Sequence, residues 1–211
     1  MSRILAVDTT GECGSIALIE NHSIREEAAL DSPDGFAHVL FGEIESMLAR
    51  HGLHWKEIDG FAAASGPGSF TGVRVGLAAV KGLAEATGRN VIAISNLLAL
   101  AWFGTKPLRA TVLDARRGDI FGAVYDNAFR LVCDEVVMPL ESWLATLPGG
   151  DLEYITGGIS LKGVERVTEA PRLLAGAIGM IAASFPELAR DPVEIDANYV
   201  RRSDAELIWR E

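Results

Sequence analysis

Residues 3–20 read RILAVDTTGECGSIALIE and predict two buried strands joined by a tight turn. The apolar runs Arg3–Asp8 and Gly14–Glu20 have the length and composition of buried strands, and the glycine-containing segment between them is typical of a turn. The chain is therefore expected to open with a β-hairpin.

Apolar periodicity and turn residues predict the elements that follow this hairpin. They are a polar strand, a helix, a buried strand, a helix, a strand and a helix, over residues 23–30, 36–50, 61–64, 71–86, 91–94 and 95–103. The order βββαβα is the one found in the ribonuclease-H-like half-domain, which occurs in pairs in actin-like and sugar-kinase-like proteins. A second copy is therefore expected further along the chain.

A second copy of the hairpin begins 106 positions after the first. Aligned without gaps, Leu5–Asp8 lies over Thr111–Asp114, and Ile16–Glu20 lies over Gly122–Asp126. Such self-similarity indicates duplication. We therefore expect an α/β protein of two ribonuclease-H-like lobes of the actin-like ATPase superfamily. Residues 1–104 form the first lobe, and residues 105–211 form a reduced second lobe with strands near 131–137 and 153–155 and a helix near 171–185.

Composition and charge exclude several classes of protein. The 211 residues carry 19 Lys and Arg against 29 Asp and Glu, a net charge of −10, so strong binding of a nucleic acid by this chain alone is not expected. No apolar run approaches the 20 or so residues of a membrane span, and the N-terminus lacks the regions of a secretion signal. Two cysteines without a CxxC pattern fit a reducing compartment. The cytoplasm is the expected location.

The most unusual string is GPGSFTG at residues 66–72, which joins a predicted strand to a predicted helix. Free N–H groups at a helix start suit an anion, but the string lacks the Gly-Lys pair of a P-loop. One interpretation is a tight connection in which Ser69 or Thr71 caps the helix. The other is a loop that faces a partner. The candidate loop residues are Gly66, Pro67, Gly68, Ser69, Thr71 and Gly72.

The helix predicted to follow, over residues 71–86, carries few charged residues and has one side made of small residues. Gly76, Ala79 and Gly82 fall on a different side from the sheet-facing Leu77 and Val80, which leaves room for a second helix to approach closely. The helix over 36–50 has a similarly wide apolar arc. Either the two helices cover each other or they face a partner. The predicted partner surface consists of Phe36, Leu40, Phe41, Ile44, Leu48, Phe70, Arg74, Gly76, Ala79 and Gly82.

Remnants of a nucleotide site are a further possibility to test. An aspartate and two threonines follow the first strand, where actin-like ATPases have a phosphate turn, and an aspartate takes the equivalent place in the second copy. A Gly-Gly pair resembles the one that contacts adenosine in that superfamily. All these residues are also common structural choices at strand ends and turns. The vestigial nucleotide-binding set is Asp8, Thr9, Thr10, Asp114, Gly157 and Gly158.

Hydrolytic chemistry has no support in the sequence. The four histidines form no HExxH pattern, and no GxSxG elbow is present, so neither a metal site nor a serine nucleophile is predicted.

Three blocks together resemble the bacterial TsaB family, also called YeaZ. They are ILAVDTT at residues 4–10, SGPGSFTGVRVGLAAVKGLA at 65–84 and LDARRGDIFGAVY at 113–125. Their order and spacing match the family, and Asn198–Arg201 resembles its C-terminal Tyr-x-Arg signature. The chain departs from the pattern in having Phe36-Ala37-His38 where the family has His-Ser-Glu.

The resemblance implies a function in making threonylcarbamoyladenosine in tRNAs that read ANN codons. It implies a non-catalytic scaffold, an inactive homologue of metallopeptidase-like proteins, that works with a TsaD-like transferase subunit and a TsaE-like ATPase. The chain would have no cofactor of its own, with ATP only at the partner interface. A competing hypothesis is an independent ATPase or small-molecule kinase that uses Asp8 and Asp114. A third is a homodimer of this chain.

Overall fold

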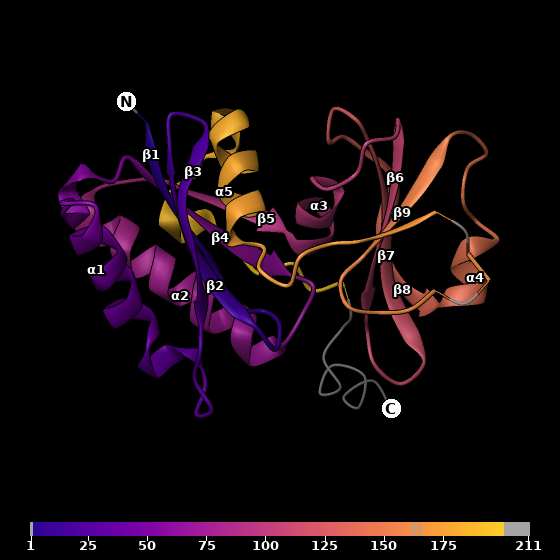
Figure 1. Ribbon diagram of the computed structural model, residues 1–211, viewed down its shortest axis with the longest axis horizontal. Coiled ribbons are helices and arrows are strands. Elements are labelled where there is room, and N and C mark those ends of the chain that lie inside the picture. Colours follow the sequence, from indigo (N-terminus) through magenta and orange to yellow (C-terminus); the bar gives the residue numbers. More distant parts are fainter. Residues whose placement is uncertain (1, 162, 165, 201–211) are drawn as a thin grey trace.

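The computed structural model describes residues 2–161, 163–164 and 166–200, and it contains two mixed five-stranded sheets with helices packed on them (Figure 1). The first sheet has the order β3-β2-β1-β4-β5 and the second the order β10-β9-β6-β7-β8. The first sheet consists of β1 (Arg3–Asp8), β2 (Gly14–Glu20), β3 (Ser23–Leu30), β4 (Gly60–Gly66) and β5 (Val91–Ser95). The second consists of β6 (Leu108–Asp114), β7 (Asp119–Asp126), β8 (Leu131–Pro139), β9 (Leu152–Thr156) and β10 (Val167–Glu169).

The two sheets repeat one topology. In each, three antiparallel strands are followed by two strands parallel to the first. The likeness extends to a hydrogen bond: the Thr10 N–H donates to Asp8 Oδ1 at 2.8 Å, and the Arg116 N–H donates to Asp114 Oδ1 at 2.7 Å. The predicted two-lobed α/β fold is therefore confirmed. The division at residues 104 and 105 stays a prediction.

Helices cover both faces of the first sheet, where β1, β2 and β4 are buried almost throughout. The helices of the described residues are α1 (Leu40–Arg50), α2 (Phe70–Thr87), α3 (Asn96–Ala101), α4 (Leu140–Leu144) and α5 (Ala175–Ser184), with 3₁₀ turns at Phe36–His38, Trp55–Glu57, Pro186–Leu188 and Pro192–Glu194. Because side chains alternate along a strand, Leu5 and Val7 pack with α1 and α2, while Ile4 and Ala6 pack with α5. Figure 1 shows α1 and α2 together on one side of this sheet and α5 on the other.

The second repeat is reduced in its helices. Its first helix, α4, has 5 residues where α1 has 11. Between β9 and β10, where the first repeat places the 18-residue α2, the described residues of the segment 157–166 form bends, a turn and irregular chain. The buried Trp143 of α4 packs with Val112 and Val124 and so supplies much of the cover on that face of the second sheet.

The last helix of the second repeat belongs to the core of the first sheet. Ile178 and Ile181 of α5 pack on Ala6 and Ile19, and a Cβ at Gly179 would lie 2.4 Å from Ile19, so glycine permits this close approach. In the other direction, α3 of the first repeat packs on β6 and β7. The two lobes therefore share their helices.

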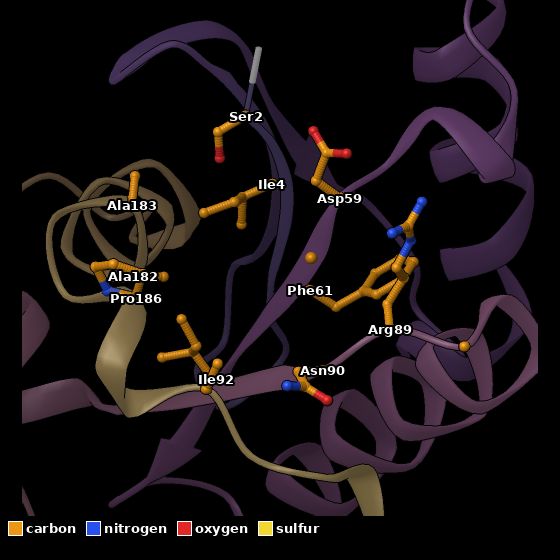
Figure 2. Close-up of a pocket in the computed structure, with 13 residues that line it drawn as sticks. Ser2, Ile4, Asp59, Phe61, Arg89, Asn90, Ile92, Ala182, Ala183 and Pro186 are labelled. Atoms are coloured by element: carbon orange, nitrogen blue, oxygen red, sulfur yellow. The ribbon is translucent and has the colours of Figure 1, made fainter.

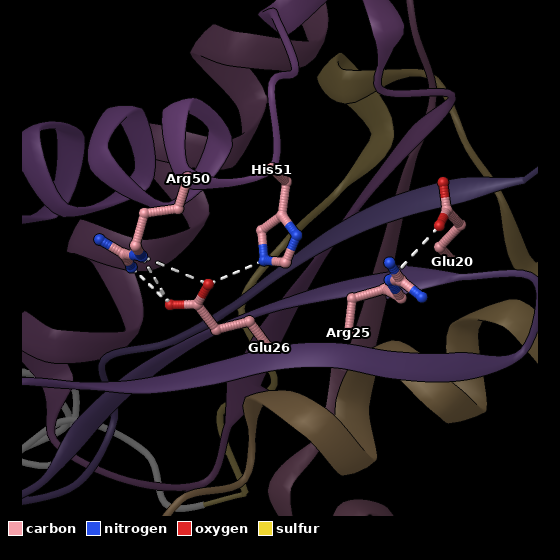
Figure 3. A network of polar contacts seen from close by, with 5 residues as sticks. All are labelled: Glu20, Arg25, Glu26, Arg50 and His51. Atoms are coloured by element: carbon pink, nitrogen blue, oxygen red, sulfur yellow. Dashed lines mark hydrogen bonds and ion pairs between the residues drawn. The ribbon is translucent and has the colours of Figure 1, made fainter.

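A polar network joins the end of α1 to strand β3, as Figure 3 shows. The Arg50 side chain donates to the Glu26 carboxylate, and His51 Nε2 lies 2.8 Å from Glu26 Oε2. These hydrogen bonds lower the pKa of the Glu26 carboxyl, with that from Arg50 the largest cause. The helix predicted from residue 36 begins as a 3₁₀ turn, and α1 proper starts at Leu40.

Candidate functional site

The turn after β1 is closed by its own hydrogen bonds. Asp8, Thr9 and Thr10 are each 4% exposed or less. The Thr10 hydroxyl donates to Asp8 Oδ1 at 2.6 Å and accepts from Asn96 Nδ2 at 2.7 Å. Burial raises the pKa of the Asp8 carboxyl, and the hydrogen bonds from Thr10 act against that rise.

The loop at 66–72 and the start of α2 lie directly on this turn. The Ser69 N–H donates to the Thr10 carbonyl at 2.7 Å, and the Thr9 hydroxyl donates to the Gly72 carbonyl at 2.6 Å. A Cβ at Gly72 would lie 2.0 Å from the Thr9 oxygen, and one at Gly68 would lie 2.7 Å from the Thr10 oxygen. The two threonine hydroxyls are thus bonded to protein atoms, and the start of α2 packs directly on the turn.

Ser69 is the N-cap of α2, since its Oγ accepts from the Gly72 N–H at 3.3 Å. Thr71 is exposed and does not cap the helix. The sequence left open whether this string is a connection or a partner loop. Its glycines serve the connection, because they allow the backbone to contact the Asp8–Thr10 turn.

The remaining residues of the vestigial nucleotide set have different environments. Asp114 has a half-exposed side chain, and its turn contacts the first lobe where Arg116 approaches Glu12 Oε1 at 3.4 Å. Gly157 packs under Leu113, where a Cβ would lie 2.5 Å from that side chain. Gly158 is exposed with a φ of +78°, which explains glycine at this turn without a ligand.

The surface of α1 and α2 corrects the predicted partner residues. Phe41 and Phe70 are 49% and 46% exposed, and Arg74 and Gly82 are exposed as well. Several predicted members instead lie inside the chain. Leu40, Ile44, Leu48 and Ala79 belong to the core between the helices and the sheet, Gly76 contacts Thr9, and Phe36 packs half-buried over Gly14.

The partner residues were predicted wrongly because the buried part of each helix surface is wider than the helical spacing indicated. Helical spacing alone does not show how far the sheet wraps around a helix, and the Asp8–Thr10 turn extends the contact to Gly76. The exposed side of α2 is therefore rotated from the predicted one. It carries Thr71, Ala78 and Gly82, with Val75 half-buried at its edge, and a Cβ at Gly82 would meet no atom within 4 Å.

The end of the described chain adds an aromatic cluster that the sequence did not predict. The Tyr199 ring lies 5.5 Å from the Phe70 ring, Arg74 Nε donates to the Tyr199 hydroxyl at 3.1 Å, and the Arg74 guanidinium lies 3.8 Å above the Phe70 ring. Tyr199 is 46% exposed. Arg201, the last residue of the C-terminal signature, lies outside the described residues.

A pocket of about 350 Å³ lies at the opposite end of the first sheet from Asp8. Figure 2 shows Arg89, Asp59 and Phe61 around it, with Ile92 and the end of α5. It faces the amino ends of β4 and β5, whereas ligands of parallel α/β sheets bind at the carboxyl ends. We therefore do not assign it to the candidate site.

In the described part of the chain, no group of three or more His, Cys, Asp or Glu side chains is arranged to hold a metal ion. No helix in that part has the length and hydropathy to cross a membrane.

Comparison with known proteins agrees with this fold and these motifs. The family model for TsaD, tRNA N6-adenosine threonylcarbamoyltransferase, matches residues 34–205. The tRNA threonylcarbamoyladenosine biosynthesis protein TsaB of Bacillus subtilis is 29% identical over 99% of this chain and 98% of its own length. The chain belongs to the TsaB/YeaZ family. TsaB of Escherichia coli is 32% identical over 59% of this chain, an alignment that spans only 55% of that protein.

A solved TsaB/YeaZ structure extends the agreement to three dimensions. YeaZ from Pseudomonas aeruginosa superposes with a TM-score of 0.78 and 27% identity over 94% of this chain and all of that one. The match to the TsaD model also shows that this TsaB/YeaZ chain is related in sequence to the transferase family itself. A transferase of that name from Maricaulis maris is 41% identical over 61 residues.

Proposed function

We propose that this TsaB/YeaZ chain is a non-catalytic scaffold that binds and stabilises a TsaD-type transferase subunit in the synthesis of threonylcarbamoyladenosine in tRNAs that read ANN codons. The observation that carries the non-catalytic part is the closed Asp8–Thr10 turn. Its hydroxyls are bonded to protein atoms, and the Gly72 backbone occupies the adjoining space. A TsaE-type ATPase completes the assembly, and any ATP binds at the joint surface rather than to this chain alone.

The exposed side of α2 supports the choice of a partner helix. Ala78 and Gly82 leave a shallow strip next to Arg74, while Phe70 and Phe41 expose about half of each ring. Arginine and aromatic residues beside small ones are typical of an interface that accepts another helix closely. Because the chain is related in sequence to TsaD, a TsaD-type subunit would offer helices of similar design.

A matched pair of glycine variants tests this interface. Gly82→Trp places a large side chain on the exposed side of α2, where a Cβ meets no atom within 4 Å. Gly149→Trp is the control, because Gly149 is also exposed with free space around its Cβ but lies in the second lobe. We expect Gly82→Trp alone to lose binding to the transferase subunit and formation of the modified adenosine. Equal binding by both variants would exclude this surface as the interface.

The competing ATPase or kinase hypothesis has its own test. ATP turnover by the isolated chain is compared with turnover by an Asp8→Ala, Asp114→Ala double variant. Turnover that the double variant lacks would refute the scaffold proposal. We expect no turnover from either protein, because Asp8 is 2% exposed and the start of α2 packs on the adjoining Thr9.

A further inference from the structure

The last described residues, 195–200, form a C-terminal strap that runs from one lobe to the other. The strap starts on the first lobe, where the Ile195 carbonyl accepts from Lys81 Nζ at 2.8 Å and the Ile195 side chain is buried in the core beneath α2. It ends on the second lobe, where Val200 packs against the apolar cluster that contains Phe121 and Tyr125. The strap therefore contacts both cores within six residues.

Asn198, in the middle of the strap, bonds to both lobes at once. Its backbone N–H donates to the Ser65 carbonyl in β4 at 2.8 Å. Its side-chain Nδ2 donates to Glu135 Oε2 in β8 at 2.6 Å. The other Glu135 oxygen accepts from the hydroxyl of Tyr125, which is 4% exposed. The Glu135 carboxylate, which is held by Tyr125 of the second lobe, thus accepts a hydrogen bond from Asn198, whose backbone is bonded to the first lobe.

The backbone of Asn198 packs closely against the backbone of Gly66 at the end of β4. Gly66 has a φ of +102°, and a Cβ there would lie 3.0 Å from the Asn198 carbonyl oxygen. Asn96 Oδ1 accepts from the Gly66 N–H at 3.1 Å, which ties the same point to the closed Asp8–Thr10 turn through Thr10. The strap therefore lies against the carboxyl end of β4, in the space between the lobes.

A second tie acts on the linker between the lobes. Glu153 Oε2 accepts from the N–H groups of Thr105 and Lys106 at 2.7 and 3.2 Å. Arg109 donates to the carbonyls of Ala101 and Lys106. The linker ties lie at one side of the boundary between the lobes, and α3 packs on β6 and β7. The strap adds a separate contact that joins the end of β4 to β8.

We propose that the strap at residues 195–200 is a latch that holds the two lobes at one angle, and that the Asn198–Glu135 hydrogen bond closes it. Breaking this bond leaves the two cores intact, because Asn198 and Glu135 belong to neither apolar cluster. The latch is internal to the chain. Its failure in the test below would therefore leave the proposed partner binding untouched.

A reciprocal exchange of the two side chains tests the latch. Asn198→Asp sets two carboxylates against each other, which is expected to open the latch, since like charges at this distance repel. Adding Glu135→Gln restores a carboxylate–amide pair with the donor on the other lobe. Spin labels at Glu43→Cys on α1 and Glu141→Cys on α4, with Cys13 and Cys133 replaced by serine, report the distance between the lobes.

We expect one narrow distance distribution in the wild type, a broader or longer one in Asn198→Asp, and a narrow one again in the double variant. A wild-type distribution in folded Asn198→Asp, or a double variant as broad as the single one, would overturn the proposal. If Asn198→Asp does not fold, Asn198→Ala removes the side-chain bond without adding charge. A narrow distribution in that variant would overturn the proposal equally.

Discussion

Gly72→Ala tests the contact that closes the Asp8–Thr10 turn. The added Cβ would lie 2.0 Å from the Thr9 carbonyl oxygen and 3.0 Å from its carbon, and both are backbone atoms. Backbone does not turn aside as a flexible side chain does, so the start of α2 has to move. Overpacking in a core costs about 1 to 3 kcal/mol. At this distance we expect about 3 kcal/mol.

The expected change in melting temperature follows from the size of the chain. For proteins of 150 to 250 residues, 1 kcal/mol corresponds to roughly 2–4 °C in Tm, so Gly72→Ala is expected to lower Tm by about 6 to 12 °C. Gly82→Ala in the same helix is the control, because its Cβ meets no atom within 4 Å. It should raise Tm by about 2 to 4 °C, since alanine exceeds glycine in helix propensity by about 1 kcal/mol.

Calorimetric unfolding of the two variants measures both values. If Gly72→Ala unfolds within 2 °C or so of the wild type, the Thr9–Gly72 contact is absent in solution. The closed Asp8–Thr10 turn, on which the non-catalytic part of the proposed function rests, would then be refuted. The opposite signs expected for one substitution in one helix exclude a general effect of alanine.

Three other expectations follow from the structure. Glu26→Gln should lower Tm at neutral pH, because the hydrogen bond from Arg50 lowers the pKa of Glu26 in the folded protein. The stabilisation that the Glu26 carboxylate contributes is therefore present above the pKa of the unfolded chain and is lost as the pH falls through the pKa of the folded protein. The difference in Tm between Glu26→Gln and wild type should therefore shrink below about pH 4. Ser15→Ala should lower the free energy of unfolding by about 1–3 kcal/mol, because the buried Ser15 hydroxyl accepts hydrogen bonds from the N–H groups of Leu174 and Ala175. Hydrogen exchange at those two N–H groups should become faster. Fluorescence titration of the isolated chain with tRNA should show no salt-sensitive binding at physiological ionic strength, because a net charge of −10 offers few phosphate contacts, and steeply salt-dependent micromolar binding would contradict this.

The fold was largely predictable because its signals are local. The strands Arg3–Asp8, Gly14–Glu20 and Ser23–Leu30 have the predicted bounds, since the turn at Asn21 and His22 and the apolar runs mark their ends. The duplication was visible because Leu5–Asp8 aligns without gaps with Thr111–Asp114, and in the structure Asp8 and Asp114 accept the same hydrogen bond from the residue two positions on. Each strand and turn is specified by neighbours within a few residues, so both copies kept a recognisable pattern.

The site was predicted less well because its contacts join distant segments. Helical spacing placed Gly76 and Ala79 on a free side, but the Asp8–Thr10 turn packs on Gly76, and Ala79 is buried in the core of the first lobe. No periodicity indicated that Asn198 bridges Ser65 and Glu135, since one polar residue in an irregular segment has no pattern. Such contacts depend on how distant segments of the chain are placed by the tertiary fold, which the local sequence does not specify.

The exchange of helices between the lobes has a consequence for synthesis on the ribosome. The face of the first sheet that carries Ala6, Ala17 and Ile19 is covered by α5, which ends at Ser184. At about 5 to 20 residues per second, the roughly 80 residues from position 104 to the end of α5 take about 4 to 16 s to make. During that interval the nascent first lobe presents an uncovered apolar sheet face, which makes it a substrate for chaperones and open to association with nascent chains on the same message.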